Sequence, residues 1–335
     1  MQLSSNLQRF HNKTTYYCWV GVFFLAIGGL IALLYAATLQ IDYLWAWYRI
    51  PQYFVYQETI EIMAEIEGEV DAVTINGDQA VIVVAGSDGQ ETYTAPSQDL
   101  RISEGDTIYA GDVLATYTEW RPGILLQGLG TTLKASVYAI AFGILLGLLG
   151  GIARISPNPA LKWSAITYVE MVRGSPLLVQ LLIWYFVIGT MLNTILANYK
   201  LGQISAMGYG IAALSFFAGA YVTEIVRAGI QSIHRGQIEA SRSLGMSYAQ
   251  AMRHVILPQA MRRILPPLAG QFISLIKDSS LLGVIAVREL TKATREVVTT
   301  SLQAFELYFV CAILYLVLTF TLSMLTQYLE RRLAS

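Results

Sequence analysis

The stretch EASRSLGMSYAQAMRHVILPQAMRR, residues 239–263, is a basic, helix-forming segment set between two apolar parts of the chain. Residues 237–244 predict a short helix, and Gly245 is a natural left-handed stop for it. We therefore expect two short helices joined by an elbow at Gly245.

The second helix of this element has its own start and stop signals. Ser247 and Gln250 fit a capping box at its beginning. We expect it to end near Leu257, because Pro258 disfavours helix in the residue before it. Three residues at i, i+4 and i+7 spacing are expected to share one face of this helix: Tyr248, Met252 and Val255.

Composition places the whole chain in a membrane. Hydrophobic residues make up 55% of the 335 residues and charged residues 13%, about half the charged share of a soluble protein. A membrane-spanning helix needs about 20 mostly apolar residues. Five uncharged runs qualify, and a sixth is interrupted by Lys277 and Asp278. The runs are 16–39, 135–153, 174–199, 201–223 and 307–329, with 264–287 as the interrupted one.

These runs predict an all-α polytopic membrane protein with about six helices. The first run is too long for a signal-peptide core, so we expect a retained anchor at 16–39 after a tail at 1–15. The net charge of −1 gives no argument for nucleic-acid binding. Cys18 and Cys311 are isolated in apolar runs, which predicts packing and neither a disulfide nor a metal site.

The distribution of basic residues predicts the orientation, because Lys and Arg favour cytoplasmic loops. Arg9 and Lys13 place the N-terminus inside, and residues 40–120, with only Arg49 and Arg101 as basic residues, then lie outside. The quoted loop and the C-terminus fall inside. A basic group at Arg288, Lys292 and Arg295 fits poorly with this orientation, unless the segment folds back into the protein.

Residues 60–118, within the segment 40–120, differ in kind from the rest. A strand-like run at 80–84 is accompanied by turn signals at Asn76-Gly77-Asp78, Asp88-Gly89 and Glu104-Gly105-Asp106. Residues 100–117 resemble half of a lipoyl-like, barrel-sandwich β domain. No lysine lies between Lys13 and Lys134, which excludes lipoylation or biotinylation of a hairpin lysine. We expect a small extracytoplasmic β scaffold or docking module.

The basic loop resembles the EAA loop of ABC importer permeases. That motif reads Glu-Ala-Ala, three residues, Gly, nine residues, Ile, any residue, Leu-Pro. The matching residues are Glu239, Ala240, Gly245, Leu257 and Pro258. The chain departs from the motif at Ser241 and Val255, both small changes.

The flanking segments resemble the polar amino acid branch of that family, with histidine and glutamine permeases as its type. They are VEMVRGSPLLVQ at 169–180, AYVTEIVRAGIQSI at 220–233 and ILPPLAGQFISLIKDSSLLGVIAVREL at 264–290. The resemblance covers about 123–330 and includes the EAA loop at 234–259. It implies the type I importer fold, with five core helices plus one added N-terminal helix, in a bacterial cytoplasmic membrane. The β insert is a departure from the family.

The resemblance also implies the partners. Separate ATPase subunits would bind ATP and Mg²⁺ and dock on the EAA loop, a second permease subunit would complete the pathway, and an extracytoplasmic binding protein would deliver solute. The chain itself is expected to bind no cofactor and to be no enzyme. It lacks the phosphate-loop pattern, and Gly128 to Lys134 has its glycines and lysine at the wrong spacing. Glu239 and Gly245 are the positions we expect to be most sensitive.

Charged residues in or beside the apolar runs are costly to insert into a bilayer. Two pairs at i, i+3 could form ion pairs: Glu170 with Arg173, and Glu224 with Arg227. They are interpreted as ion pairs that fix helix packing or as part of a solute path. The full set is Glu170, Arg173, Glu224, Arg227, Lys277 and Asp278.

Two other function classes compete with the importer. An ion-coupled secondary transporter would need acids and broken helices near the midplane, for which only Lys277 and Asp278 are candidates. A membrane-anchored scaffold working through its β insert would not need the later spanning helices. Which polar solute is carried, an amino acid or a related compound such as an opine, is not determined by the sequence.

Overall fold

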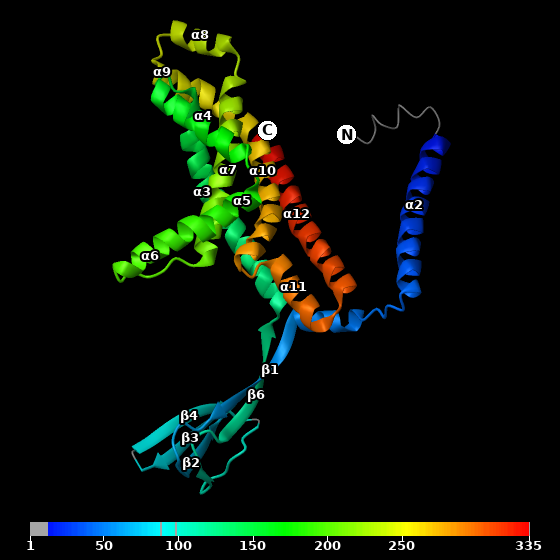
Figure 1. The fold of residues 1–335 in the computed structure, drawn as a ribbon, viewed down its shortest axis with the longest axis vertical. Coiled ribbons are helices and arrows are strands. Elements are labelled where there is room, and N and C mark those ends of the chain that lie inside the picture. Colours follow the sequence, from blue (N-terminus) through cyan, green and yellow to red (C-terminus); the bar gives the residue numbers. More distant parts are fainter. Residues whose placement is uncertain (1–12, 88, 98, 335) are drawn as a thin grey trace. The chain divides into compact units, whose positions relative to one another are not determined.

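The computed structural model describes residues 13–87, 89–97 and 99–334, in two compact units, Met1–Trp47 and Tyr48–Ser335. The first unit contains the helix α2, Lys13–Gln40, in dark blue in Figure 1. An 18-residue apolar stretch within its span, Thr15–Gln40, has no residue buried inside the chain. Of the two cysteines predicted to pack, Cys311 is buried and Cys18, on this helix, is exposed. Arg9 lies outside the described residues.

The second unit begins within a 3-10 helix, Trp47–Tyr53, which leads into the β strands. β1 pairs antiparallel with β6 from Val55↔Pro122 to Met63↔Val113. The other strands form a sheet of order β4-β3-β2-β5. The strand bounds are β1 Val55–Met63, β2 Gly68–Asn76, β3 Gln79–Gly86, β4 Gly89–Pro96, β5 Thr107–Ile108 and β6 Val113–Pro122.

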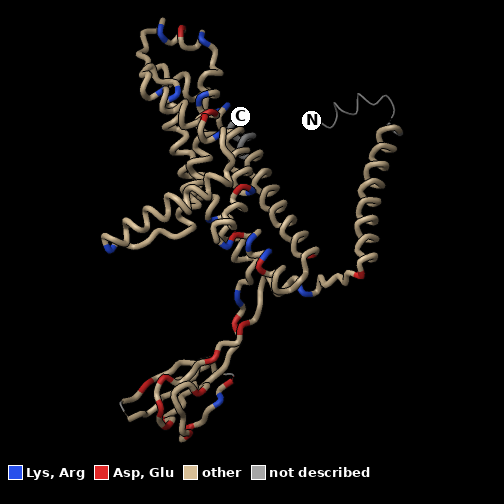
Figure 2. The backbone as a smooth tube through the Cα atoms, viewed as in Figure 1, with Lys and Arg blue, Asp and Glu red and all other residues tan. Residues whose placement is uncertain are grey.

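The turn signals in this part have the expected backbone geometry where they are described. Gly77 joins β2 to β3 at φ +66°, and Gly105 has φ +85°. Asp88 lies outside the described residues. The sheet covers a small core in which alternate residues of β3 face inward, with Ile82 and Val84 fully buried. Figure 2 marks acidic positions in red along the backbone of these strands; residues 55–122 hold 14 acidic residues and two arginines.

The remainder of the second unit is helical. Its helices are α3 Ile124–Ile155, α4 Pro159–Arg173, α5 Leu177–Leu182, the π-helix η2 Ile183–Gly189, α6 Thr190–Asn198, α7 Ala206–Gln231, α8 Arg235–Ser243, α9 Tyr248–Ala251, the π-helix η3 Met252–Ile256, α10 Leu257–Asp278, the 3-10 helix η4 Ser279–Ile285, α11 Leu290–Ser301 and α12 Ala304–Ala334. Within the described residues, six helices are long and apolar enough to cross a membrane, which agrees with the number predicted. The helix α4 was not anticipated as a separate element.

The core of the helical part lies where α3, α5, α7, α10 and η4 meet. Four fully buried leucines come from four of these elements: Leu181 from α5, Leu214 from α7, Leu275 from α10 and Leu282 from η4. Elements far apart in the sequence therefore share one apolar cluster, while the outward faces of the long helices stay apolar and exposed. This is the pattern of helices surrounded by lipid.

The helices α3 and α7 approach each other through glycines on α3. Gly143, Gly147 and Gly151 recur every four residues and so lie on one face of the helix. A Cβ atom built on Gly147 would overlap the side chain of Val222 on α7, and one on Gly151 would overlap Val226. Small residues at such spacing let two membrane helices pack backbone against backbone.

We predict that Gly147→Ala lowers the melting temperature of the purified protein in detergent. The added methyl group has no room beside Val222, and overpacking of this kind costs about 1–3 kcal/mol. Gly130→Ala on the same helix is the matched control, because nothing lies within 4 Å of its Cβ position. It should leave the melting temperature unchanged or raise it. Equal melting temperatures for the two variants would contradict the proposed close contact.

Candidate functional site

The basic loop folds as a helical hairpin, residues 234–259, between α7 and α10. The helix α8 starts after His234, whose side chain accepts a hydrogen bond from the Gly236 N–H at 3.1 Å. It ends where the Gly245 N–H donates to the Arg242 carbonyl and the Met246 N–H to the Ser241 carbonyl. These two bonds form a Schellman motif. Gly245 has φ +83°, so the predicted left-handed stop is confirmed.

The start of α9 is the predicted capping box. The Ser247 N–H donates to the Gln250 side chain at 2.8 Å, and the Gln250 N–H donates to the Ser247 hydroxyl at 3.3 Å. Both backbone donors are therefore satisfied within the turn. The elbow between the two helices is closed by hydrogen bonds on each side of Gly245.

The predicted end of this helix near Leu257 is wrong, because the helix continues through Pro258 into α10. The π-helix η3 precedes the proline, and the Leu257 N–H donates to the Met252 carbonyl, five residues back. A π turn shifts the hydrogen-bond ladder by one residue, which accommodates a residue that has no N–H. The Gln259 side chain also donates to the Val255 carbonyl at 2.8 Å. Helix therefore extends without a break from the elbow into the apolar core.

The inner face of the hairpin and the first turns of α10 pack together on α7. Ile256 of the hairpin and Ala260 and Ile264 of α10 are buried in one cluster with Val222 and Val226 of α7. This contact is close, as a Cβ on Gly229 would overlap Ile264. A hydrogen bond of 2.5 Å from an Arg263 side-chain N–H to the Ser232 carbonyl adds a polar tie. The hairpin is thus held to two long helices at once.

The outer face of the hairpin is exposed and partly apolar. Glu239 and Ala240 are exposed, whereas Ser241 is buried and donates to the Ile238 carbonyl. Leu244 is 80% exposed and Tyr248 is 61% exposed. Tyr248 is the first residue of α9, and Met252 and Val255 pack against the buried cluster. That these three residues share one face stays a prediction.

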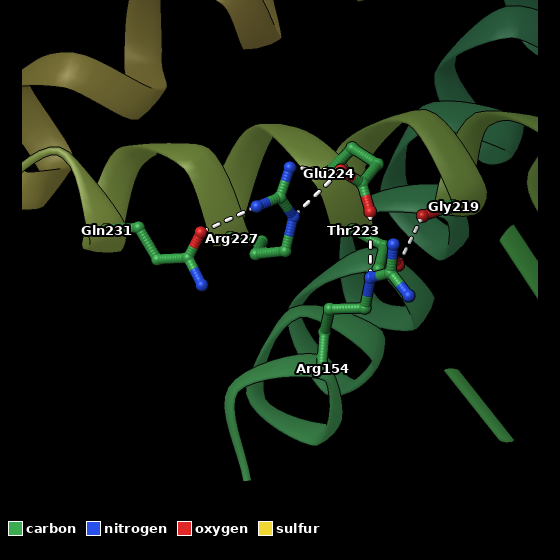
Figure 3. Close-up of polar contacts among 6 residues, drawn as sticks. All are labelled: Arg154, Gly219, Thr223, Glu224, Arg227 and Gln231. Atoms are coloured by element: carbon green, nitrogen blue, oxygen red, sulfur yellow. Dashed lines mark hydrogen bonds and ion pairs between the residues drawn. The ribbon is translucent and has the colours of Figure 1, made fainter. Parts of the chain in front are cut away.

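Two of the six charged candidates form part of a polar network between the ends of α3 and α7 (Figure 3). Glu224 bonds to Arg227 at 2.7 Å, as predicted, and also to Arg154 at 3.0 Å. Arg227 donates onward to the Gln231 side chain at 2.6 Å. The side chains of Arg154 and Glu224 are only 15% and 17% exposed. A carboxylate shared by two guanidinium groups is neutralised here and holds the two helices together.

The other four candidates lie elsewhere. Within the described residues no ion pair joins Glu170 to Arg173, so that predicted pair is wrong; both are exposed. Instead, the Arg173 guanidinium lies 5.4 Å from the ring centre of Tyr221, an arrangement that favours a cation over an aromatic face. Lys277 is exposed and Asp278 half-buried at the end of α10. The six residues therefore do not form one charged site.

Two charged residues with largely buried side chains, Arg154 and Glu289, were not predicted from the sequence. Arg154 was not among the predicted site residues, although it directly follows an apolar run, as Glu224 does. Glu289 is fully buried and caps α11 by accepting the N–H groups of Thr291 and Lys292, each at 2.7 Å, and the Tyr315 hydroxyl at 3.0 Å. Burial raises the pKa of Glu289, and these hydrogen bonds act in the opposite direction. An acid directly before a helix was the available signal.

Comparison with known proteins gives the family. The family model "Binding-protein-dependent transport system inner membrane component" matches residues 139–335, which include the hairpin, the Arg154–Glu224 network and the core. The chain belongs to this family. The match begins after α2 and the β strands, so this transport family accounts for the helical part of the second unit.

Individual relatives agree with this assignment. The chain is 41% identical over 208 residues to the "Probable glutamine ABC transporter permease protein GlnM" of Bacillus subtilis, covering 62% of this chain and 92% of that relative. It is 37% identical over 210 residues to the "Glutamine transport system permease protein GlnP" of Escherichia coli, covering 63% and 93%. A solved structure, "Crystal structure of an amino acid ABC transporter with histidines", matches at 40% identity and TM-score 0.56, covering 62% and 94%. The helical part therefore has the type I permease fold.

We predict energetic coupling between Arg154 and Glu224. Arg154→Met and Glu224→Gln should each lower the melting temperature of the purified permease in detergent. The double variant should lose less stability than the sum of the single losses, by about 1 kcal/mol for a partly buried pair in contact. Arg154→Met combined with Glu58→Gln is the control pair, because Glu58 bonds to Arg121 in the β strands and shares no partner with Arg154. Additive losses for Arg154 and Glu224 would contradict the pairing.

Proposed function

We propose that this chain forms the membrane pathway of an importer for a polar amino acid, with glutamine as the first candidate solute. Membership of the family and the two glutamine permease relatives support this proposal. The observation that carries it is the hairpin, which exposes Glu239, Leu244 and Tyr248 outward while its inner face is fixed to α7 and α10. Exposed apolar side chains on a rigid support suit a contact with a separate protein.

The partner at this hairpin is an ATPase subunit. The chain has no phosphate loop of its own, so ATP and Mg²⁺ bind to that partner and this chain acts without a cofactor. A nucleotide shifts the pathway between two states only if its binding is transmitted to the helices. The Gly229–Ile264 contact and the Arg263–Ser232 hydrogen bond are the connection that would transmit it. The exposed Glu239 is available to a cationic group of the ATPase.

The orientation follows from charge. The 14 acidic residues and two arginines of residues 55–122 favour the extracytoplasmic side, and the basic hairpin favours the cytoplasm. We therefore place both termini in the cytoplasm of a bacterium, the β strands outside, and a solute-binding protein on that side. A second permease subunit, identical or homologous, would complete the pathway.

We assign the Arg154–Glu224–Arg227 network to helix packing. Glu224 already bonds to two arginines, so its charge is not free to bind solute or a coupling ion. An ion-coupled transporter would need an uncompensated acid in the pathway, and the arrangement of Glu224 argues against that class. The network would instead fix the position of the end of α3 relative to α7, and α7 leads into the hairpin.

The deciding experiment is ATPase activity of the purified complex in lipid, with and without binding protein and a panel of amino acids. Stimulation of the ATPase activity by glutamine would support the proposal. Stimulation by another amino acid would keep the importer mechanism and change only the identity of its solute. An absence of any co-purifying ATPase, together with no response to any solute, would refute the importer mechanism.

We predict that Gly245→Val reduces the initial rate of solute uptake at equal membrane abundance by roughly tenfold, because a β-branched residue at positive φ costs about 1–3 kcal/mol. The variant strains the elbow and misplaces the hairpin. Gly202→Val is the matched control: like Gly245 it has nothing within 4 Å of its Cβ position, but its φ is not in the left-handed region. Uptake that is equally normal in both variants would show that the elbow does not take part in coupling.

A further inference from the structure

We propose that the aromatic segment, residues 43–47 in the first unit, binds the headgroup layer of the lipid bilayer at the end of α2. The occupant of this surface is lipid, not protein. The proposal rests on the proposed function only in that α2 crosses a membrane, and it does not depend on which solute is carried.

The backbone turns sharply after α2 and brings the aromatic segment beside the last helical turn. Asp42 adopts a left-handed conformation at φ +52°, and the Tyr43 N–H donates to the Thr38 carbonyl at 3.1 Å. The Trp45 indole N–H donates to the Thr38 hydroxyl, also at 3.1 Å. Thr38 is 5% exposed under this turn. The segment is therefore a built feature of the helix end.

The rings in this turn form a continuous aromatic surface. The ring centres of Tyr43 and Trp45 are 5.5 Å apart, edge to face. The Trp45 and Trp47 rings are stacked at 5.6 Å with an interplanar angle of 4°. Trp47 is 46% exposed, and the adjacent Leu44 is 88% exposed. Tryptophan and tyrosine prefer the boundary between headgroups and hydrocarbon, because each ring is apolar with one polar group.

The length of α2 supports this position. At the other end of the helix, Tyr17 is 67% exposed and Trp19 is 60% exposed. From Trp19 to Leu39 the helix advances 20 residues without a charge, or about 30 Å at 1.5 Å per residue. That is the thickness of a typical hydrocarbon core. The aromatic groups thus stand at both boundaries of the layer that the helix spans.

Tryptophan fluorescence of the full-length chain, reconstituted in lipid vesicles without partner subunits, tests the proposal. The chain has six tryptophans, and Trp19, Trp120, Trp163 and Trp184 are changed to Phe to leave Trp45 and Trp47. The vesicles contain phospholipids brominated either near the headgroup or near the chain end. We expect the shallow bromines to quench roughly twofold more strongly than the deep ones, as for an interfacial ring.

Two single-tryptophan controls, with all six native tryptophans changed to Phe, calibrate the depth. Leu30→Trp, at an exposed position in the middle of α2, should be quenched most by the deep bromines. Tyr109→Trp, at an exposed position in the β-stranded part, should respond to aqueous iodide and not to lipid.

Three outcomes would overturn the proposal. The pair Trp45 and Trp47 could respond only to iodide, which means water. It could respond to neither quencher, which means a protein contact. Leu30→Trp could show no deeper quenching than the pair, which means that α2 does not cross the bilayer. Solute uptake by the same variants is measured separately, so failure of the importer mechanism would be distinguished from failure of this assignment.

Discussion

The backbone contact between α3 and α7 is the constraint on which the helical fold depends. Because Gly143, Gly147 and Gly151 present no side chain to α7, the two helices pack without a layer of side chains between them. The close approach brings Arg154 within 3.0 Å of Glu224. Helices α5, α10 and η4 then complete the apolar cluster around the pair. Contact this close would let a displacement of one helix act directly on the other.

The hairpin extends this rigidity to the surface. Its elbow is closed by a Schellman motif on one side of Gly245 and a capping box on the other, so little freedom remains in the turn itself. Its second helix is continuous with α10 through the π turn before Pro258. A force on the exposed face would therefore act on α10 along the helix axis and on α7 through Ile264 and Arg263. In the proposed coupling, displacement would pass through an uninterrupted helix and not through a flexible loop.

The β strands are inserted in a way that leaves the helical part undisturbed. The chain leaves through β1 and returns through β6, and the two meet at Val55↔Pro122. At this point the Gly123 N–H donates to the Phe54 carbonyl at 2.6 Å, and a Cβ on Gly123 would overlap the Tyr53 carbonyl. An insertion whose two ends are adjacent is tolerated, because the flanking residues can keep the positions and contacts they have without it. The two glutamine permease relatives align over 92% and 93% of their own length, within about 210 residues, so they and this longer chain can share one fold.

Local features of the fold were predictable from the sequence. The turn at Gly77, the stop at Gly245, the capping box at Ser247, the Glu224–Arg227 pair and the number of apolar spans each depend on residues within a few positions of one another. The resemblance of the hairpin also indicated the family. The errors concern how distant segments meet. The helix continues through Pro258 because the π turn before it accommodates a residue without a backbone N–H. The Arg173 guanidinium lies over the Tyr221 ring and does not pair with Glu170.

By itself, then, the sequence determined the local backbone, the membrane environment and the family of this protein. The tertiary structure alone decided the partners of its charges and the closeness of its helices. Arg154 and Glu224 are 70 positions apart, and their contact depends on how α3 and α7 are rotated against each other. That rotation is set by the close fit of α7 against the glycine face of α3. Apolarity alone would allow several other pairings of these helices. Hydrophobic patterning shows which face of a helix is apolar, but not which partner fits it.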